Sequence, residues 1–425
     1  MEENQSLRLE ITGVSPVFIG SGDLYSQLDY VVENQKLHLL NFDSLLEEIP
    51  LNLIDDLTKN ILDNFSNNRW EGDVKIFLED YDLDWKKHVE QSHELIGEIG
   101  KNELHQFIKT SDRLYIPGSS VKGAIRTCIL FSILKNNPAF RNREESTILR
   151  YFNDRSLQDL IRTSANDDLL RALIISDLHL SDPTNYTKIV ESSVYHLKDK
   201  ESTIPIFYEV LDEGFHCSGT IKINKHLIKA KVLKTQDFDL TISSLMEAVN
   251  EFSQEIIAHE LKTFQSQKDD NLSQIISFYS SLDQQVKNLG KNECVLRLGQ
   301  GSSVLSVTLY LNFQDNKRIV QKYRNLELVK FDIPDRNDRR YAIANKGGRP
   351  YLIDKDSRDR PRLNETWLCS IKPRGRTVYV KLLEKMDPSQ QFLAQELLYP
   401  LTRKFILNHK QQLGLPFGWI KLSIN

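Results

Sequence analysis

The residues best suited to chemistry lie in the segment IPGSSVKGAIR, residues 116–126, where an apolar run ends and a helix is expected to begin. Pro117 and Gly118 can make the turn, and Ser119 or Ser120 can cap the helix that follows. The first turn of a helix leaves backbone N–H groups without acceptors, and these groups attract anions. The segment therefore predicts a phosphate-binding helix start.

Two cations on the same expected helix strengthen this prediction. Lys122 and Arg126 lie four residues apart, so they share one face of the helix. A phosphate at the helix start would meet backbone donors and both cations together. A nucleotide-binding P-loop requires Gly-Lys-Ser/Thr in direct succession, whereas Gly123 follows Lys122 here. The spacing therefore argues against an NTPase.

Three glycine loops follow apolar, strand-like runs: the first at residues 19–22 (IGSG), the second at 117–120 (PGSS) and the third at 298–303 (LGQGSS). Each alone is more often a tight turn than a binding site. Together they favour a ligand with many phosphates, because glycine lets backbone amides approach a phosphodiester chain. The predicted RNA-binding residues in and beside these loops are Gly20, Ser21, Gly22, Gly118, Ser119, Ser120, Lys122, Arg126, Arg297, Gly299, Gln300, Gly301, Ser302 and Ser303.

Aromatic and basic residues add to the expected RNA surface. Phe18 and Tyr25 flank the first glycine loop and can stack on bases, although Phe18 suits a core position equally well. Lys372, Arg374 and Arg376 alternate, so they point to one side of an extended segment. They line a groove in one interpretation and protect a solvated sheet edge in the other.

The uneven charge favours the RNA interpretation. The chain has a net charge of -4, yet residues 317–376 hold seventeen Lys or Arg against eight Asp or Glu. The remainder therefore carries about -13, as an ordinary acidic exterior does. One segment is thus the candidate surface for a polyanion.

Composition excludes several other classes of protein. With 425 residues, 40% hydrophobic and 27% charged, the chain can form two or three cores. It shows neither a signal-peptide pattern nor an apolar run of about 18 residues, so we expect a cytoplasmic protein. The four cysteines lie far apart, and no HExxH, GxSxG or GxGxxG pattern occurs. We therefore expect no metal and no cofactor.

Strand and helix patterns alternate along the chain, so the predicted fold class is α+β. Alternating apolar residues predict strands that include residues 7–12, 30–32 and 36–40, the last two forming a hairpin. Apolar spacings of three and four predict helices over residues 42–108, 241–267 and 271–287.

Two domains are predicted from these elements. The first covers residues 1–225 and contains a helical insertion at about 42–108. The second covers residues 226–425 and contains a charged, mobile loop at about 332–364, followed by two strands that break at 373–376.

The ordered set of motifs resembles the RAMP superfamily of CRISPR proteins. The motifs that carry the resemblance are, in order, PVFIGSG (16–22), IPGSSVKGAIR (116–126), LRLGQGSS (296–303) and KPRGR (372–376). Within the superfamily the chain is most similar to the fifth Csm subunits of type III-A effector complexes. The resemblance covers about residues 7–380.

The resemblance implies both a fold and a role. The implied fold is a tandem of ferredoxin-like, RRM-type βαββαβ domains. The implied role is that of a non-catalytic subunit at one end of the complex, which holds the 3′ portion of the crRNA. The implied partners are crRNA, the repeated backbone subunit and other Csm subunits, and host nucleases that trim the crRNA during its maturation. Backbone subunits that cut target RNA use an acidic loop residue, for which Asp23 is the nearest equivalent by position.

Two alternatives stay open. The first is a RAMP-type endoribonuclease, for which a histidine would serve as general base in metal-free RNA cleavage. No histidine lies inside the three glycine loops, which counts against this alternative. The second is a related subunit of a Cmr-like or variant type III complex, which the motifs do not separate from a Csm subunit.

Overall fold

The structure, a computed structural model, describes residues 6–56, 59, 74–100, 102–136, 164–182, 185–197, 205–233, 238–267, 269–314, 329–332, 341–346, 349–354, 367–371, 377–382, 400 and 402–425. Contacts within the chain divide it into two compact units, Met1–Leu311 with Thr402–Asn425, and Asn312–Leu401. This division differs from the boundary predicted at residue 225, which stays a prediction.

The first unit contains an eight-stranded sheet in the order β14-β22-β1-β13-β10-β8-β7, with β9 paired to β13. Its strands are β1 (Leu7–Gly13), β7 (Lys109–Thr110), β8 (Arg113–Ile116), β9 (Leu173–Ile175), β10 (Leu178–Leu180), β13 (His216–Ile223), β14 (Glu293–Arg297) and β22 (Trp419–Ile424). The predicted first strand is confirmed, because Leu9 and Ile11 alternate into the core.

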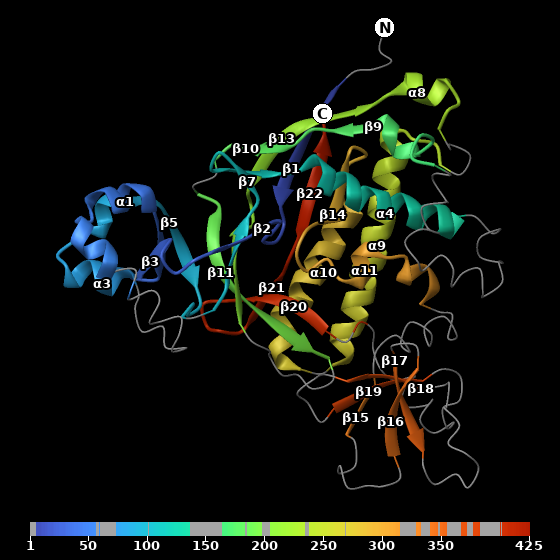
Figure 1. Cartoon of the computed structure of the whole chain (residues 1–425). Coiled ribbons are helices and arrows are strands. Elements are labelled where there is room, and N and C mark those ends of the chain that lie inside the picture. Colours follow the sequence, from blue (N-terminus) through green and yellow to red (C-terminus); the bar gives the residue numbers. More distant parts are fainter. Residues whose placement is uncertain are drawn as a thin grey trace. The chain divides into compact units, whose positions relative to one another are not determined.

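Two long helices, α4 (Gly118–Asn136) and α9 (Ile242–Ser266), pack on each other and against this sheet (Figure 1). The Phe131 and Phe252 rings lie 4.8 Å apart between them. The elements β1, α4, β9, β13, α9 and β14 follow the βαββαβ order of a ferredoxin-like fold, and β22 is inserted between β14 and β1. The predicted α+β, ferredoxin-like fold class is confirmed.

A nine-stranded sheet completes the first unit, in the order β2-β6-β12-β11-β5-β4-β3, with β20 paired to β11 and β21. Its strands are β2 (Gly20–Tyr25), β3 (Tyr30–Glu33), β4 (Lys36–Leu40), β5 (Val89–Ile96), β6 (Leu104–Phe107), β11 (Thr187–His196), β12 (Ile206–Leu211), β20 (Thr402–Leu407) and β21 (Leu413–Pro416). The predicted hairpin is confirmed, since β3 and β4 pair and its turn residues Asn34 and Gln35 have φ of 51° and 58°.

Shorter helices complete the unit. They are α1 (Phe42–Glu48), α3 (Val74–Asp80), α8 (Lys225–Lys229), α10 (Ser273–Lys287), α11 (Val304–Val307) and the 3-10 helices η1 (Trp85–His88), η2 (Leu169–Ala172), η3 (Asp270–Leu272) and η4 (Tyr310–Phe313), the last of which begins in this unit. The described part of the chain includes no helix with the length and apolar character that a bilayer crossing needs.

The predicted helical insertion at residues 42–108 is wrong in its second half. Helices α1, α3 and η1 occupy described parts of the first half, but β5 and β6 follow them. In β5, His93 and Leu95 alternate into the core, which is the period of a strand. The apolar residues of this short segment fit both periods, and pairing with β4 and β11 decides between them.

Acidification is expected to destabilise the protein through His93, which is 3% exposed. Burial lowers the pKa of this imidazole from 6.5 to about 4, so the native state keeps it neutral. The contribution of neutral His93 to the folding free energy is therefore fully present above pH 6.5 and is lost as the pH falls toward 4. Between pH 7 and pH 5 we expect a loss of about 2 kcal/mol in unfolding free energy. Urea titrations of the wild type and His93→Leu at both pH values measure the unfolding free energy. If the two proteins lose the same free energy between pH 7 and pH 5, the predicted role of His93 is contradicted.

The second unit contains a three-stranded sheet, β15-β19-β18, and the two-stranded pair β16-β17. The strands are β15 (Val329–Asp332), β16 (Tyr341–Lys346), β17 (Arg349–Asp354), β18 (Trp367–Ile371) and β19 (Thr377–Leu382). The two strands predicted on either side of residues 373–376 are confirmed. The predicted loop at 332–364 is wrong where β16 and β17 pair, because period-two apolar positions such as Ile343 and Leu352 lie within the dense charge.

Candidate nucleic-acid interface

The first and third glycine loops meet in the structure. The Gln300 N–H donates to the Phe18 carbonyl oxygen at 2.8 Å, which joins the third loop to the residue before the first. Gly299 has a φ of +65°, and a Cβ there would overlap with the same carbonyl oxygen. Only glycine combines this left-handed backbone with so close an approach.

The turn before β22 is hydrogen-bonded to the segments next to both loops. Gly418 donates its N–H to the Pro16 carbonyl at 2.9 Å and accepts from the Leu298 N–H at 2.8 Å. A Cβ on Gly301 would lie 2.7 Å from the Phe417 Cβ, so the third loop also packs closely on this turn. Three segments that are distant in sequence are thus joined by hydrogen bonds and close packing at one place, which we call the loop junction.

The first glycine loop is the start of an edge strand rather than a free loop. Gly20 pairs with Phe107 and Leu24 with His105, and the register shifts between these pairs. Gly20, Ser21 and Gly22 are exposed. Gly22 has a φ of +99°, and a Cβ there would meet nothing within 4 Å. The main chain of this loop is therefore open to a ligand.

The aromatic residues beside the first loop do not serve as a stacking surface. Phe18 is 5% exposed, and its ring centroid lies 4.6 Å from that of Tyr208. Tyr25 is 9% exposed and donates its hydroxyl to Glu209. The core position considered for Phe18 is the correct one, and burial removes Tyr25 as well.

The second glycine loop forms the start of α4, but with a different cap from the predicted one. The helix begins at Gly118, so Ser119 and Ser120 lie in its first turn. The Gly118 N–H donates to Asp177 Oδ1 at 2.9 Å. A Cβ on Gly118 would overlap with the carbonyl oxygen of Ile175, so glycine is needed for packing here. One donor of the predicted anion site is therefore occupied by a carboxylate.

The two cations on α4 have different surroundings. Arg126 donates to Asp168 Oδ2 at 3.1 Å and is 25% exposed. Lys122 is half-buried, and burial lowers its pKa while Asp168 opposes that shift. Between them, Gly123 is exposed and a Cβ there would meet nothing within 4 Å. A backbone can therefore approach the helix closely beside Lys122.

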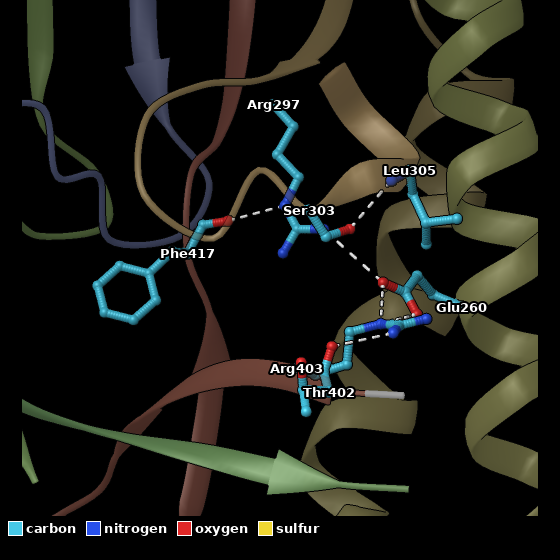
Figure 2. A network of polar contacts seen from close by, with 7 residues as sticks. All are labelled: Glu260, Arg297, Ser303, Leu305, Thr402, Arg403 and Phe417. Carbon is cyan, nitrogen blue, oxygen red and sulfur yellow. Dashed lines mark hydrogen bonds and ion pairs between the residues drawn. The ribbon is translucent and has the colours of Figure 1, made fainter. Parts of the chain in front are cut away.

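Arg297 is a structural residue, since its side chain is 2% exposed. Its Nε donates to the Phe417 carbonyl at 3.0 Å, and its Nη1 lies 3.8 Å from Glu260 Oε1 (Figure 2). Glu260 also accepts from Arg403 Nε at 2.8 Å. This buried charge network anchors the strand that leads into the third loop, so we remove Arg297 from the RNA-binding residues.

The remaining predicted residues fall into two groups. Gly301, Ser302 and Ser303 are half-buried in the third loop, where the Ser303 hydroxyl accepts from the Leu305 N–H and caps α11. Lys372, Arg374 and Arg376 lie outside the described residues.

The second glycine loop lies apart from the loop junction. It follows β8, five strands from β14 in the sheet order, which corresponds to about 24 Å along a sheet. The link between them is α11, which directly follows the third loop and packs against α4. A ligand that touches both places must be a polymer rather than a single nucleotide.

Sequence reasoning missed two residues that complete these sites from distant segments. Asp168 binds Arg126 in the third turn of α4, and the Tyr208 ring packs against that of Phe18. Their partners lie far away in the chain, so no local pattern around Asp168 or Tyr208 marks these contacts. Within the described ranges no cluster of three or more His, Cys, Asp or Glu residues could hold a metal ion.

Known proteins resemble this chain in sequence or in fold. A relative from Methanocaldococcus jannaschii, named CRISPR system Cms protein Csm5, is 28% identical over 316 residues, covering 70% of this chain and 71% of the relative. The crystal structure of T. onnurineus Csm5 matches with a TM-score of 0.57 and 23% identity, over 74% of this chain and 94% of that one.

A second solved structure agrees over nearly the whole length. It is a chain of the cryo-EM structure of a Csm-crRNA-target RNA ternary complex in a type III-A CRISPR-Cas system, with a TM-score of 0.62, 20% identity and coverage of 99% of this chain and 100% of that one. Residues 10–304 match the family model of the RAMP superfamily. The resemblance expected from the motifs is confirmed, and the chain belongs to the RAMP superfamily.

Proposed function

We propose that this chain is a crRNA-binding structural subunit of a type III-A Csm effector complex. The loop junction carries the proposal, because the Gln300–Phe18 hydrogen bond joins two glycine loops and leaves Gly20, Ser21 and Gly22 exposed. Such backbone surfaces position RNA without reading its sequence. The resemblance to Csm5 proteins, and to a chain of a complex that holds crRNA and target RNA, supports the same role.

We further propose a position for the subunit within the complex and the partners that it contacts there. The subunit holds the 3′ portion of the crRNA, contacts the repeated backbone subunit and assists crRNA maturation without cutting RNA itself. Host nucleases that trim the 3′ end are the further proposed partners. The RNA-contacting residues are the exposed and half-buried members of the three glycine loops with Lys122 and Arg126, since Arg297 is buried.

Lys122→Ala is expected to weaken RNA binding and to reduce its salt dependence. Loss of one phosphate contact should lower the slope of log affinity against log salt concentration by about 0.7 for single-stranded RNA. Arg126 is left in place, because its removal would also remove its ion pair with Asp168 and could change stability. Filter binding of crRNA across a potassium chloride series measures the slope.

The matched control is Lys291→Ala, an exposed lysine at the other end of β14 from the third loop. Its slope should equal that of the wild type. Equal slopes for Lys122→Ala and the wild type would remove the start of α4 from the RNA surface, and salt-independent binding by the wild type would overturn the proposed function.

Gly123→Ala is expected to change stability and RNA binding in opposite directions. Alanine in a helix interior stabilises by about 0.5–1 kcal/mol relative to glycine, and a Cβ at this position has open space around it. The same methyl group blocks close approach of an RNA backbone, so affinity should fall. Thermal melting and filter binding measure the two effects. Higher stability with unchanged affinity would show that no ligand approaches this face.

One observation favours the alternative of a RAMP-type endoribonuclease. His105 on β6 pairs with Leu24 of β2, and its ring centroid lies 6.3 Å from that of Phe18, so a histidine does adjoin the loop junction. Burial lowers the pKa of His105, which keeps the imidazole neutral and able to accept a proton. Site-specific cutting of labelled repeat RNA by the purified chain, abolished in His105→Ala, would establish this activity in place of the structural role.

A further inference from the structure

A cluster of polar and aromatic side chains lies beside the loop junction. Lys404 Nζ donates to the Tyr208 hydroxyl at 2.8 Å, and Gln300 Nε2 of the third loop donates to the same oxygen at 3.3 Å. The His105 ring stacks on the Tyr208 ring with centroids 5.0 Å apart and planes 20° apart. The phenol thus connects an ammonium, an amide and an imidazole.

Strand pairing explains why these side chains meet. Tyr208 lies directly opposite His105 on β6 and opposite Val190 on β11, so all three point to one face of the sheet. Four residues further along β11, Val194 lies opposite Lys404 on β20. Residues that are four apart in a strand share a face, so Lys404 points to the same side.

Lys404 has no carboxylate partner among the described residues, unlike several other half-buried lysines of the first unit. It is half-buried, and burial lowers its pKa. Lys135, Lys188 and Lys421 each contact a carboxylate at 3.1 Å or less. Among the described residues, no carboxylate lies within ion-pair distance of Lys404. A half-buried charge without a counter-ion is unfavourable, so the site is electrostatically complete only with an anion.

The third glycine loop supplies further donors at the same place. Gly299 and Gly301, on either side of Gln300, have φ of +65° and +81°. In the described part of the chain, the N–H of neither glycine donates to a protein acceptor. Neighbouring backbone N–H groups in a turn conformation can form concave sites that bind anions. The loop therefore presents backbone donors next to the Lys404 cluster.

We propose that Lys404, Gln300 and His105 form a binding site for one nucleotide of the RNA. Lys404 and the third loop bind a backbone phosphate, and the His105 ring, whose side chain is 32% exposed, stacks on a base. This inference rests on the proposed RNA-binding function and adds to it two side chains outside the glycine loops, those of Lys404 and His105. Neither Lys404 nor His105 belongs to a motif of the sequence.

Two variants of the full-length chain separate the phosphate contact from the base contact. Lys404→Met keeps the length of the side chain and removes its charge, so the salt slope of RNA binding should fall by about 0.7. His105→Ala removes a stacking surface but no charge at neutral pH, so affinity should fall about fivefold or more with an unchanged slope. Fluorescence anisotropy of a labelled single-stranded RNA across a potassium chloride series measures both quantities.

Three measurements test whether a loss of RNA binding comes from misfolding rather than from loss of the contact. Lys404→Met replaces an uncompensated charge by an apolar chain, so its melting temperature should equal or exceed that of the wild type. Lys410→Met removes an exposed lysine from the turn after β20 and should leave the salt slope unchanged. Lys404→Arg retains the charge and should retain the wild-type slope.

The outcomes distinguish this inference from the function on which it rests. If the wild type binds RNA and Lys404→Met matches it in affinity and slope, the nucleotide site is overturned while the proposed function stands. A wild type that does not bind RNA would overturn the proposed function itself.

Discussion

Glu260→Gln is expected to lower the free energy of unfolding by about 3–5 kcal/mol, because it removes a buried carboxylate that lies between two buried guanidinium groups. Glu260 is 0% exposed and lies 2.8 Å from Arg403 Nε and 3.8 Å from Arg297 Nη1. The amide of glutamine keeps the shape of the side chain but removes the buried negative charge that both guanidinium groups contact. Urea titration followed by circular dichroism measures the change.

The matched control for this variant lies on the same helix. Glu247 is exposed on α9, and Glu247→Gln should change the unfolding free energy by no more than about 0.5 kcal/mol. Because Arg297 leads into the third glycine loop, Glu260→Gln should also weaken RNA binding in the fraction that remains folded. A stability equal to that of the control would show that Glu260 does not hold the network together.

Gly299→Ala is expected to lower the unfolding free energy by about 3 kcal/mol and to separate the first and third loops. The left-handed φ of +65° costs about 1 kcal/mol for alanine. The added methyl group also overlaps with the Phe18 carbonyl oxygen, and relief of such an overlap costs about 1–3 kcal/mol. The Gln300–Phe18 hydrogen bond should be lost with it, so RNA affinity should fall as well. Chemical denaturation and filter binding measure both effects.

Gly22→Ala is the control that isolates backbone strain from overlap. Gly22 has a φ of +99°, but a Cβ there meets nothing within 4 Å. This variant should therefore lose only about 1–2 kcal/mol. If both glycine variants lost the same unfolding free energy, the close contact between the first and third loops would contribute nothing to stability.

Local patterns were sufficient for much of the fold. Alternation in residues 7–12 predicted β1, and the amphipathic patterns of residues 241–267 and 271–287 predicted α9 and α10. These segments are long or regular enough for one period to dominate. β5 was predicted as a helix and β16 and β17 as a loop, because short strands depend on the partners that pair with them.

In the candidate site, too, local features could be predicted from the sequence, whereas features that depend on distant residues could not. The glycine loops could be predicted from the sequence, because the backbone freedom and small size of glycine are properties of the single residue. The role of Arg297 was not visible, because its burial depends on Glu260 and Phe417, which are far away in the chain. Likewise, the cap on Gly118 comes from Asp177 rather than from the adjacent serines.

The sequence by itself determined the α+β class, the three glycine loops and the cations on α4, since these follow from residue types at short spacings. The tertiary structure alone decided that the first and third loops meet, that Arg297 lies in the core, and that Lys404 lies beside Tyr208 without a carboxylate partner in the described chain. The physical reason is that burial and charge compensation depend on long-range strand pairing, which no local pattern of residues encodes.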